Sequence, residues 1–172
     1  GSWKVKNRFF RDMMREGIEV YPFGEVKFAA LTKRINYRNH RKLVIIDGKL
    51  GYIGGMNIAE RYYKGLSWGR WRDTHIRIEG MAVNALQTSF FVDWYYASRI
   101  LVSKSEYFPK VERQGDTDMQ IITSYPMGEW KSIKQGLLQV ISQSRRYLYI
   151  QTPYFLPTGP ILRALRNAAL AG

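Results

Sequence analysis

His40 and Lys42 are the two residues whose types and spacing are best suited to chemistry. They stand two positions apart in the stretch 40–46, which reads as a strand. Side chains alternate between the faces of a strand, so His40 and Lys42 share one face, about 6–7 Å apart. A neutral imidazole is present near pH 7 and can attack phosphorus without first losing a proton. A lysine ammonium can neutralise phosphoryl oxygens. We therefore expect this pair to hold one phosphate ester, with His40 as the nucleophile.

A Gly-Gly-x-Asn run and an aspartate complete the candidate site. Gly54 and Gly55 would let the backbone approach a phosphate closely, and Asn57 would add a neutral donor. A carboxylate should orient the imidazole through its second nitrogen, and Asp73 is the best candidate. Asp47 ends the His-x-Lys-x4-Asp pattern about 23 Å from the histidine along a straight strand, so we interpret it as a turn residue.

Each of these signals also has a plainer interpretation. A histidine beside Arg41 and Lys42 is typical of a solvated basic patch, and a Gly-Gly-x-Asn run is common in loops. The functional interpretation is favoured by the whole arrangement, in which the histidine, lysine, aspartate and glycine-asparagine run follow one another at fixed spacing.

Hydrophobic periodicity predicts the elements that position these residues. The first block should contain a helix at 6–16, a strand at 18–21, a β-hairpin of 40–46 and 50–53, a short helix within 56–66, a strand at 72–79, and a long helix at 81–103 whose aromatic stripe packs in the core. Asp-Gly between two apolar runs is the hairpin signal. Residues 104–118 read as a linker.

A second block begins near residue 119. We expect strands at 119–123 and 147–151 and helices at 130–144 and 161–171. The alternation of helices and strands favours an α/β fold with a sheet covered by helices. A short match between the ends of the two blocks, with Gly17 aligned to Gly172, leaves an internal duplication open. The domains are therefore 1–103, a linker at 104–118, and 119–172.

The composition narrows the partners and the chemistry. Lys and Arg number 27 against 14 Asp and Glu, a net charge of +13, which favours nucleic acid, acidic lipid or phosphorylated small molecules. The absence of cysteine excludes disulfides, thiolate zinc sites and cysteine nucleophiles. Two histidines disfavour a multi-histidine metal site, and we expect no metal and no cofactor. No apolar stretch reaches the roughly 18–20 residues of a transmembrane helix.

Several segments resemble the phospholipase D superfamily and, within it, the bacterial cardiolipin synthases. The resemblance covers essentially the whole chain and is carried by residues 3–8, 34–42, 54–59, 71–75 and 151–155. It implies a phospholipase D-like α/β fold with a mixed sheet flanked by helices, built from two repeats. Members carry two His-x-Lys-x4-Asp signatures that meet at one active site. Only one occurs here, so we expect a fragment holding the end of the first repeat and the start of the second.

The resemblance implies an activity and its residues. One phosphatidylglycerol would donate its phosphatidyl group to another, releasing glycerol without a metal. His40 would form a phosphohistidine, Asp73 would orient it, Asp47 would complete the signature, and the phosphate would be held by Lys42, Gly54, Gly55 and Asn57. Implied partners are phosphatidylglycerol and other anionic phospholipids, the membrane surface, and the missing second half or a second copy of the chain. The parent would lie at the bacterial cell membrane, and the fragment alone would be inactive.

Two alternatives remain open. The chain could be a phosphodiesterase, such as a nuclease, that completes its site as a two-fold dimer. It could also be a non-catalytic module that adheres to anionic surfaces, in which case salt would weaken binding and loss of His40 would not.

Overall fold

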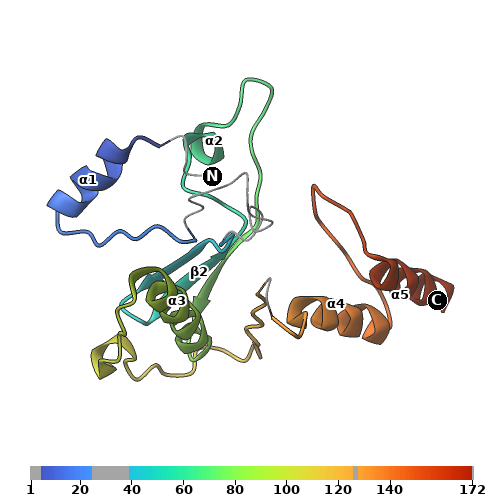
Figure 1. Cartoon of the computed structure of the whole chain (residues 1–172). Helices are drawn as coiled ribbons and strands as arrows, with labels where there is room; N and C mark the ends of the chain where they lie inside the picture. The colour runs from blue at the N-terminus through green and yellow to red at the C-terminus, as the bar shows by residue number, and fades with distance from the viewer. Residues whose placement is uncertain (1–4, 25–38, 126–127, 172) are drawn as a thin grey trace. The chain divides into compact units, whose positions relative to one another are not determined.

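The computed structural model describes residues 5–24, 39–125 and 128–171 (Figure 1). The chain divides into two compact units, residues 1–119 and residues 120–172. The described elements of the first unit are α1 (Asn7–Arg15), β1 (Leu43–Ile46), β2 (Leu50–Gly54), α2 (Glu60–Lys64), β3 (His75–Glu79), α3 (Ala82–Ser98) and a short 3-10 helix, η3 (Ser105–Tyr107). Every helix expected in this unit is confirmed, although α2 and α3 are shorter than predicted.

Three strands form an antiparallel sheet in the order β1-β2-β3. The prediction of a mixed sheet is wrong for the described residues. A hairpin joins β1 to β2, and the connection 55–74 returns β3 alongside β2, so all neighbours run in opposite directions. The strand expected at 18–21 is not formed. Alternation alone does not make a strand, because the backbone of a strand needs a neighbour to pair with.

The turn between β1 and β2 matches the Asp-Gly signal. The Lys49 amide donates to the Ile46 carbonyl at 3.0 Å. Asp47 and Gly48 both have positive φ, 53° and 65°. Two positive φ values are the mark of the hairpin turn that follows the right-handed twist of the strands. A Cβ atom on Gly48 would lie 2.8 Å from the Tyr107 carbonyl oxygen, so glycine also lets η3 approach the turn. The predicted role of Asp47 in the turn is confirmed.

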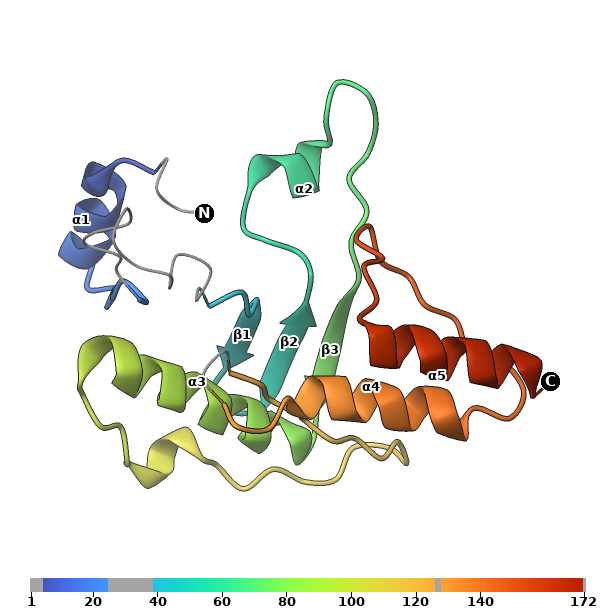
Figure 2. The same ribbon diagram turned by 45° about the vertical axis from the view of Figure 1, so that its right-hand side comes forward.

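Helix α3 lies across one face of the sheet and closes a small core (Figure 2). Ile78 of β3 is buried, as are Val83 and Leu86 of α3. The aromatic stripe expected in the core is only partly buried, since Phe90 is 38% and Tyr95 is 47% exposed. Small and aliphatic residues occupy the contact with the sheet, which lets the helix pack closely, while the aromatic rings lie towards its edges.

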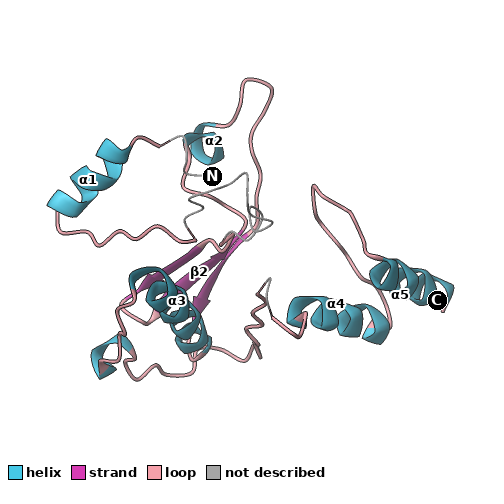
Figure 3. Cartoon of the chain, in the orientation of Figure 1, coloured by secondary structure: helices cyan, strands magenta, loops and turns pink. Residues whose placement is uncertain are grey.

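The second unit contains two described helices, α4 (Ser132–Gln143) and α5 (Gly159–Leu170), which pack against each other. Loops make up the rest of its described residues (Figure 3). The strands expected at 119–123 and 147–151 are not formed, and the predictions were wrong for the same reason as at 18–21: neither segment has a paired neighbour in the described chain. Among the described helices, none is both long and apolar enough to span a bilayer.

Candidate active site

His40 and Lys42 lie together immediately before β1. The Lys42 ammonium donates to the His40 carbonyl oxygen at 2.6 Å and lies 2.7 Å from the His40 Nδ1. The strand begins only at Leu43, so the predicted placement of both residues on one face of a strand is wrong, although their side chains do meet. An ammonium has no lone pair, so Nδ1 must act as the acceptor and the proton of a neutral ring must sit on Nε2. A phosphate that draws Lys42 away would free Nδ1.

A carboxylate on α3 fixes the backbone on both sides of the histidine. Asp93 accepts a hydrogen bond from the Asn39 Nδ2 at 2.7 Å and pairs with the Arg41 guanidinium at 2.5 Å. The Asn39 side chain also accepts from the Arg41 amide at 2.9 Å. The side chains of Arg41 and Asp93 are 23% and 13% exposed, so little water screens the pair. This network joins the residues before and after His40 to the long helix.

Two glycines, the last residue of β2 and the one after it, bring the residues before β3 against the site. The Gly55 amide donates to the Thr74 carbonyl at 3.0 Å. A Cβ atom on Gly54 would lie 2.3 Å from the same carbonyl oxygen, and one on Gly55 would lie 2.0 Å from an Asp73 carboxylate oxygen. Gly55 therefore packs directly against the Asp73 side chain, and no larger residue fits there without displacing it.

Asp73 faces the lysine rather than the histidine. Its carboxylate accepts from the Thr74 amide at 2.9 Å, and the described residues contain no hydrogen bond between Asp73 and His40. Burial lowers the pKa of Lys42, while the nearby Tyr62 phenol and Asp73 carboxylate act in the opposite direction. In this structure Asp73 therefore helps to keep Lys42 charged, which is a different contribution from the predicted orientation of the imidazole.

Sequence reasoning missed Tyr62, which stands on α2. The Asn57 Nδ2 donates to the Tyr62 hydroxyl at 2.5 Å. The same phenol acts on the charge of Lys42. The hydroxyl is thus hydrogen-bonded to the asparagine of the Gly-Gly-x-Asn run, and the phenol opposes the lowering of the Lys42 pKa by burial. An aromatic residue on a short helix carries no sequence signal of such a role. Its position five residues after Asn57 is the one hint, because a loop followed by a helical turn can bring two such residues into contact.

The remaining predicted residues lie at the periphery. Asp47 occupies the turn at the opposite end of β1 from Lys42, so its contribution is to the hairpin. His75, expected to be a surface residue, begins β3 and is half-buried, and its buried Nδ1 has no hydrogen-bond partner among the residues that the structure describes. The Gly54 backbone packs against that ring, which explains why its Nδ1 is shielded. Within the described ranges, no three acidic or histidine side chains gather closely enough to hold a metal ion.

One comparison with known proteins found relatives, and the most similar ones that it lists are cardiolipin synthases. The whole chain matches the cardiolipin synthase of Listeria innocua at 45% identity over 175 residues and the major cardiolipin synthase ClsA of Bacillus subtilis at 46% over 176. The cardiolipin synthase of Geobacillus thermodenitrificans matches at 40%. This chain is a homologue of the bacterial cardiolipin synthases. The resemblance drawn from the sequence is thereby confirmed. No protein-family profile matches the chain, and neither does any solved structure.

The homology to cardiolipin synthases covers all of this chain but only part of theirs. The chain spans 36% of the Listeria and Bacillus proteins and 35% of the Geobacillus protein. The cluster of His40, Lys42, Asn57 and Asp73 therefore lies in a region that the cardiolipin synthases share with it.

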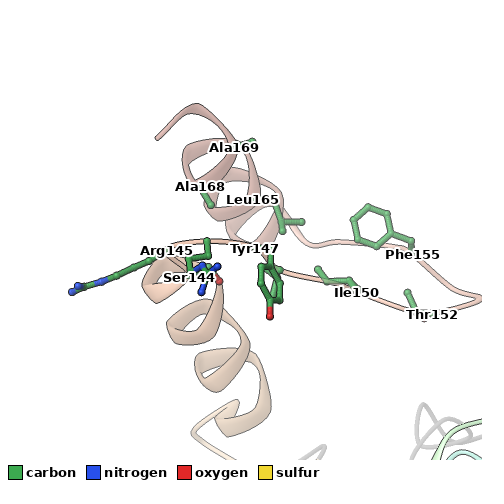
Figure 4. A pocket seen from close by; sticks show the side chains of 11 residues that line it. Ser144, Arg145, Tyr147, Ile150, Thr152, Phe155, Leu165, Ala168 and Ala169 are labelled. Atoms are coloured by element: carbon green, nitrogen blue, oxygen red, sulfur yellow. The ribbon is translucent and has the colours of Figure 1, made fainter. Parts of the chain in front are cut away.

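A pocket of about 560 Å³ lies in the second unit and contains none of the predicted site residues. Figure 4 shows its lining, in which Leu165, Ala168 and Ala169 come from α5 and Tyr147, Ile150 and Phe155 from the segment that precedes this helix. Ser144 and Arg145 follow the end of α4. The lining is mostly apolar, and it includes residues of the segment 147–151 that was expected to pair in a sheet.

Proposed function

We propose that the chain is part of a cardiolipin synthase with a phospholipase D-like fold, transferring a phosphatidyl group between two phosphatidylglycerol molecules. Two observations support the proposal: homology at 40–46% identity along the whole chain, and the convergence of His40 and Lys42 at 2.7 Å. The sheet and α3 provide the rigid base, and the connection 55–74 supplies the remaining polar groups.

His40 is the proposed nucleophile. A ring nitrogen attacks the phosphorus of the donor, a P–N bond forms, and the P–O bond to the headgroup glycerol breaks. Lys42 and Asn57 neutralise or hydrogen-bond the phosphoryl oxygens, and the Gly55 backbone lies close by. A hydroxyl of the second phosphatidylglycerol then attacks phosphorus, the P–N bond breaks, and cardiolipin is formed.

The leaving glycerol alkoxide needs a proton, which the described residues around His40 do not supply. We propose that a second histidine, from a second signature or from another copy of the chain, gives this proton and, once neutral, accepts the proton of the attacking hydroxyl in the second step. The chain would then carry half of the active site and act at an anionic membrane surface, where its charge of +13 favours binding.

The covalent intermediate provides the test. The chain would be incubated with short-chain phosphatidylglycerol, quenched at alkaline pH where phosphohistidine survives, and analysed by mass spectrometry. Without the second acid the adduct should form slowly, so a phosphatidyl adduct on His40 after long incubation, lost in His40→Ala, is the expected result. Adduct formation from an oligonucleotide but not from phosphatidylglycerol would instead support the nuclease. The absence of any adduct, with lipid binding unchanged in His40→Ala, would support the non-catalytic module.

The half-site proposal needs a separate measurement. Monomer and dimer fractions would be separated and assayed for glycerol release and cardiolipin formation. Turnover confined to the dimer, or absent from both fractions, is expected if a second histidine is required. Robust turnover by the monomer would overturn the half-site proposal while leaving the role of His40 intact.

A further inference from the structure

Tyr62 is held in place from two sides. Its hydroxyl accepts a hydrogen bond from Asn57 at 2.5 Å, and its ring lies 5.4 Å from the Trp71 ring, centroid to centroid. The Arg61 guanidinium lies over both rings, 5.0 Å from the centroid of Tyr62 and 5.6 Å from that of Trp71. Tyr62 itself is half-buried. A ring fixed in this way presents its hydroxyl in one direction, at little further cost in conformational entropy when a ligand binds.

The hydrogen bonds of the hydroxyl leave one donor available. A phenol both accepts and donates. The oxygen of Tyr62 accepts from Asn57, whereas its own O–H has no acceptor among the residues that the structure describes. The Gly54 amide donates to the Lys42 carbonyl at 3.4 Å, which brings the start of the connection 55–74 beside the lysine. The amide of Asn57 and the O–H of Tyr62 are therefore two donors at one place, in the connection that begins beside Lys42, and such a pair suits an acceptor with several oxygens.

We propose that the Tyr62 hydroxyl is a substrate-binding group that donates a hydrogen bond to a non-bridging oxygen of the phosphodiester. The inference rests on the proposed function, since it requires that His40 and Lys42 take a phosphodiester. Asn57 then has two tasks: it contacts the phosphate and, by donating to Tyr62, it fixes the direction of the O–H. A phosphodiester has two non-bridging oxygens, which Lys42 and Tyr62 can share.

Removal of the hydroxyl alone tests the inference. Tyr62→Phe keeps the ring against Trp71 and Arg61 but loses the donor. Tyr63→Phe is the matched control, because Tyr63 stands next to it on α2 and is 90% exposed. Affinity for dihexanoyl phosphatidylglycerol would be measured below its micellar concentration by NMR titration, with Lys42→Ala as the reference for the whole site. We expect Tyr62→Phe to weaken binding about tenfold and Tyr63→Phe to leave it unchanged.

The outcomes separate the inference from the proposed function. If Lys42→Ala abolishes binding and Tyr62→Phe binds as the wild type does, the inference is wrong and the phosphate site stands. If Lys42→Ala also binds normally, the proposed site itself fails. A second measurement needs no variant: with tyrosine labelled at Cζ, addition of the lipid should shift the Tyr62 signal and not that of Tyr63. Equal shifts of both signals, or no shift of either, would contradict the inference.

Discussion

Loss of the charge of Asp93 should destabilise the first unit and loosen the histidine segment. Asp93→Asn keeps the size of the side chain but leaves Arg41 facing a neutral group. Two unit charges about 4 Å apart attract by about 4 kcal/mol at an effective dielectric constant of 20. Removal of one partner of a fully buried pair costs about 3–5 kcal/mol. Here the two side chains are 23% and 13% exposed, so water recovers part of that loss. We expect the free energy of unfolding to fall by about 2–3 kcal/mol.

The assay is urea unfolding, with amide NMR spectra recorded in parallel. Asp12→Asn on α1 is the matched control, because Asp12 also pairs with two arginines, at 3.1 and 3.5 Å, but is 47% exposed. Such a surface pair should contribute less than about 1 kcal/mol. The amide signal of His40 should move in Asp93→Asn and stay in place in Asp12→Asn. Equal losses of stability in the two variants, with His40 unmoved, would refute the view that Asp93 fixes the histidine segment.

Three further predictions concern stability: one for Gly54, one for Asp47 and one for Lys42. Gly54→Ala should lower the free energy of unfolding by more than about 3 kcal/mol, because its Cβ would meet backbone atoms of residues 74 and 75 at 2.3 and 2.6 Å. Gly159→Ala is the control: a Cβ atom there has nothing within 4 Å, so the urea midpoint should change little. In the same assay, Asp47→Asn should leave the free energy of unfolding nearly unchanged, whereas Asp47→Val should lower it by about 1–2 kcal/mol. Asparagine tolerates the positive φ of 53° and a β-branched residue does not. Equal stabilities of the two variants would contradict the turn assignment. Lys42→Met should raise the free energy of unfolding at neutral pH. Burial lowers the Lys42 pKa below 10.5 in the folded state, so the unfolded chain binds the lysine proton more tightly than the folded chain does. The stability gained by the variant should therefore shrink as the pH is raised through 10.5.

Local signals accounted for the elements that the sequence predicted correctly. The Asp-Gly turn, the five helices and the contact between His40 and Lys42 all depend on residues that are close together in the sequence. The three wrongly predicted strands, at 18–21, 119–123 and 147–151, depend on pairing with distant backbone, which no local pattern specifies.

The candidate site shows the same division. The grouping of Lys42 with Asn57 and Asp73 could be anticipated because each belongs to a recognisable motif. The ion pair of Arg41 with Asp93 could not be anticipated, because 52 positions separate the two residues and each had many other possible partners of opposite charge. Tyr62 was missed for a different reason. An aromatic residue near a loop is usually part of the packing, and only the direction of its hydroxyl distinguishes it.

The connection 55–74 has a consequence for how such a site could be altered. β2 and β3 are antiparallel neighbours, so their pairing fixes only where this connection leaves and returns. Between the end of β2 and the start of β3, the connection can change in length and composition while the sheet and α3 stay as they are. His40 and Lys42 precede β1, outside this segment. A version of 58–72 transplanted from a relative should therefore leave His40 and Lys42 in place and replace only the side chains that surround them, which under the proposed function would change the choice of acceptor alcohol.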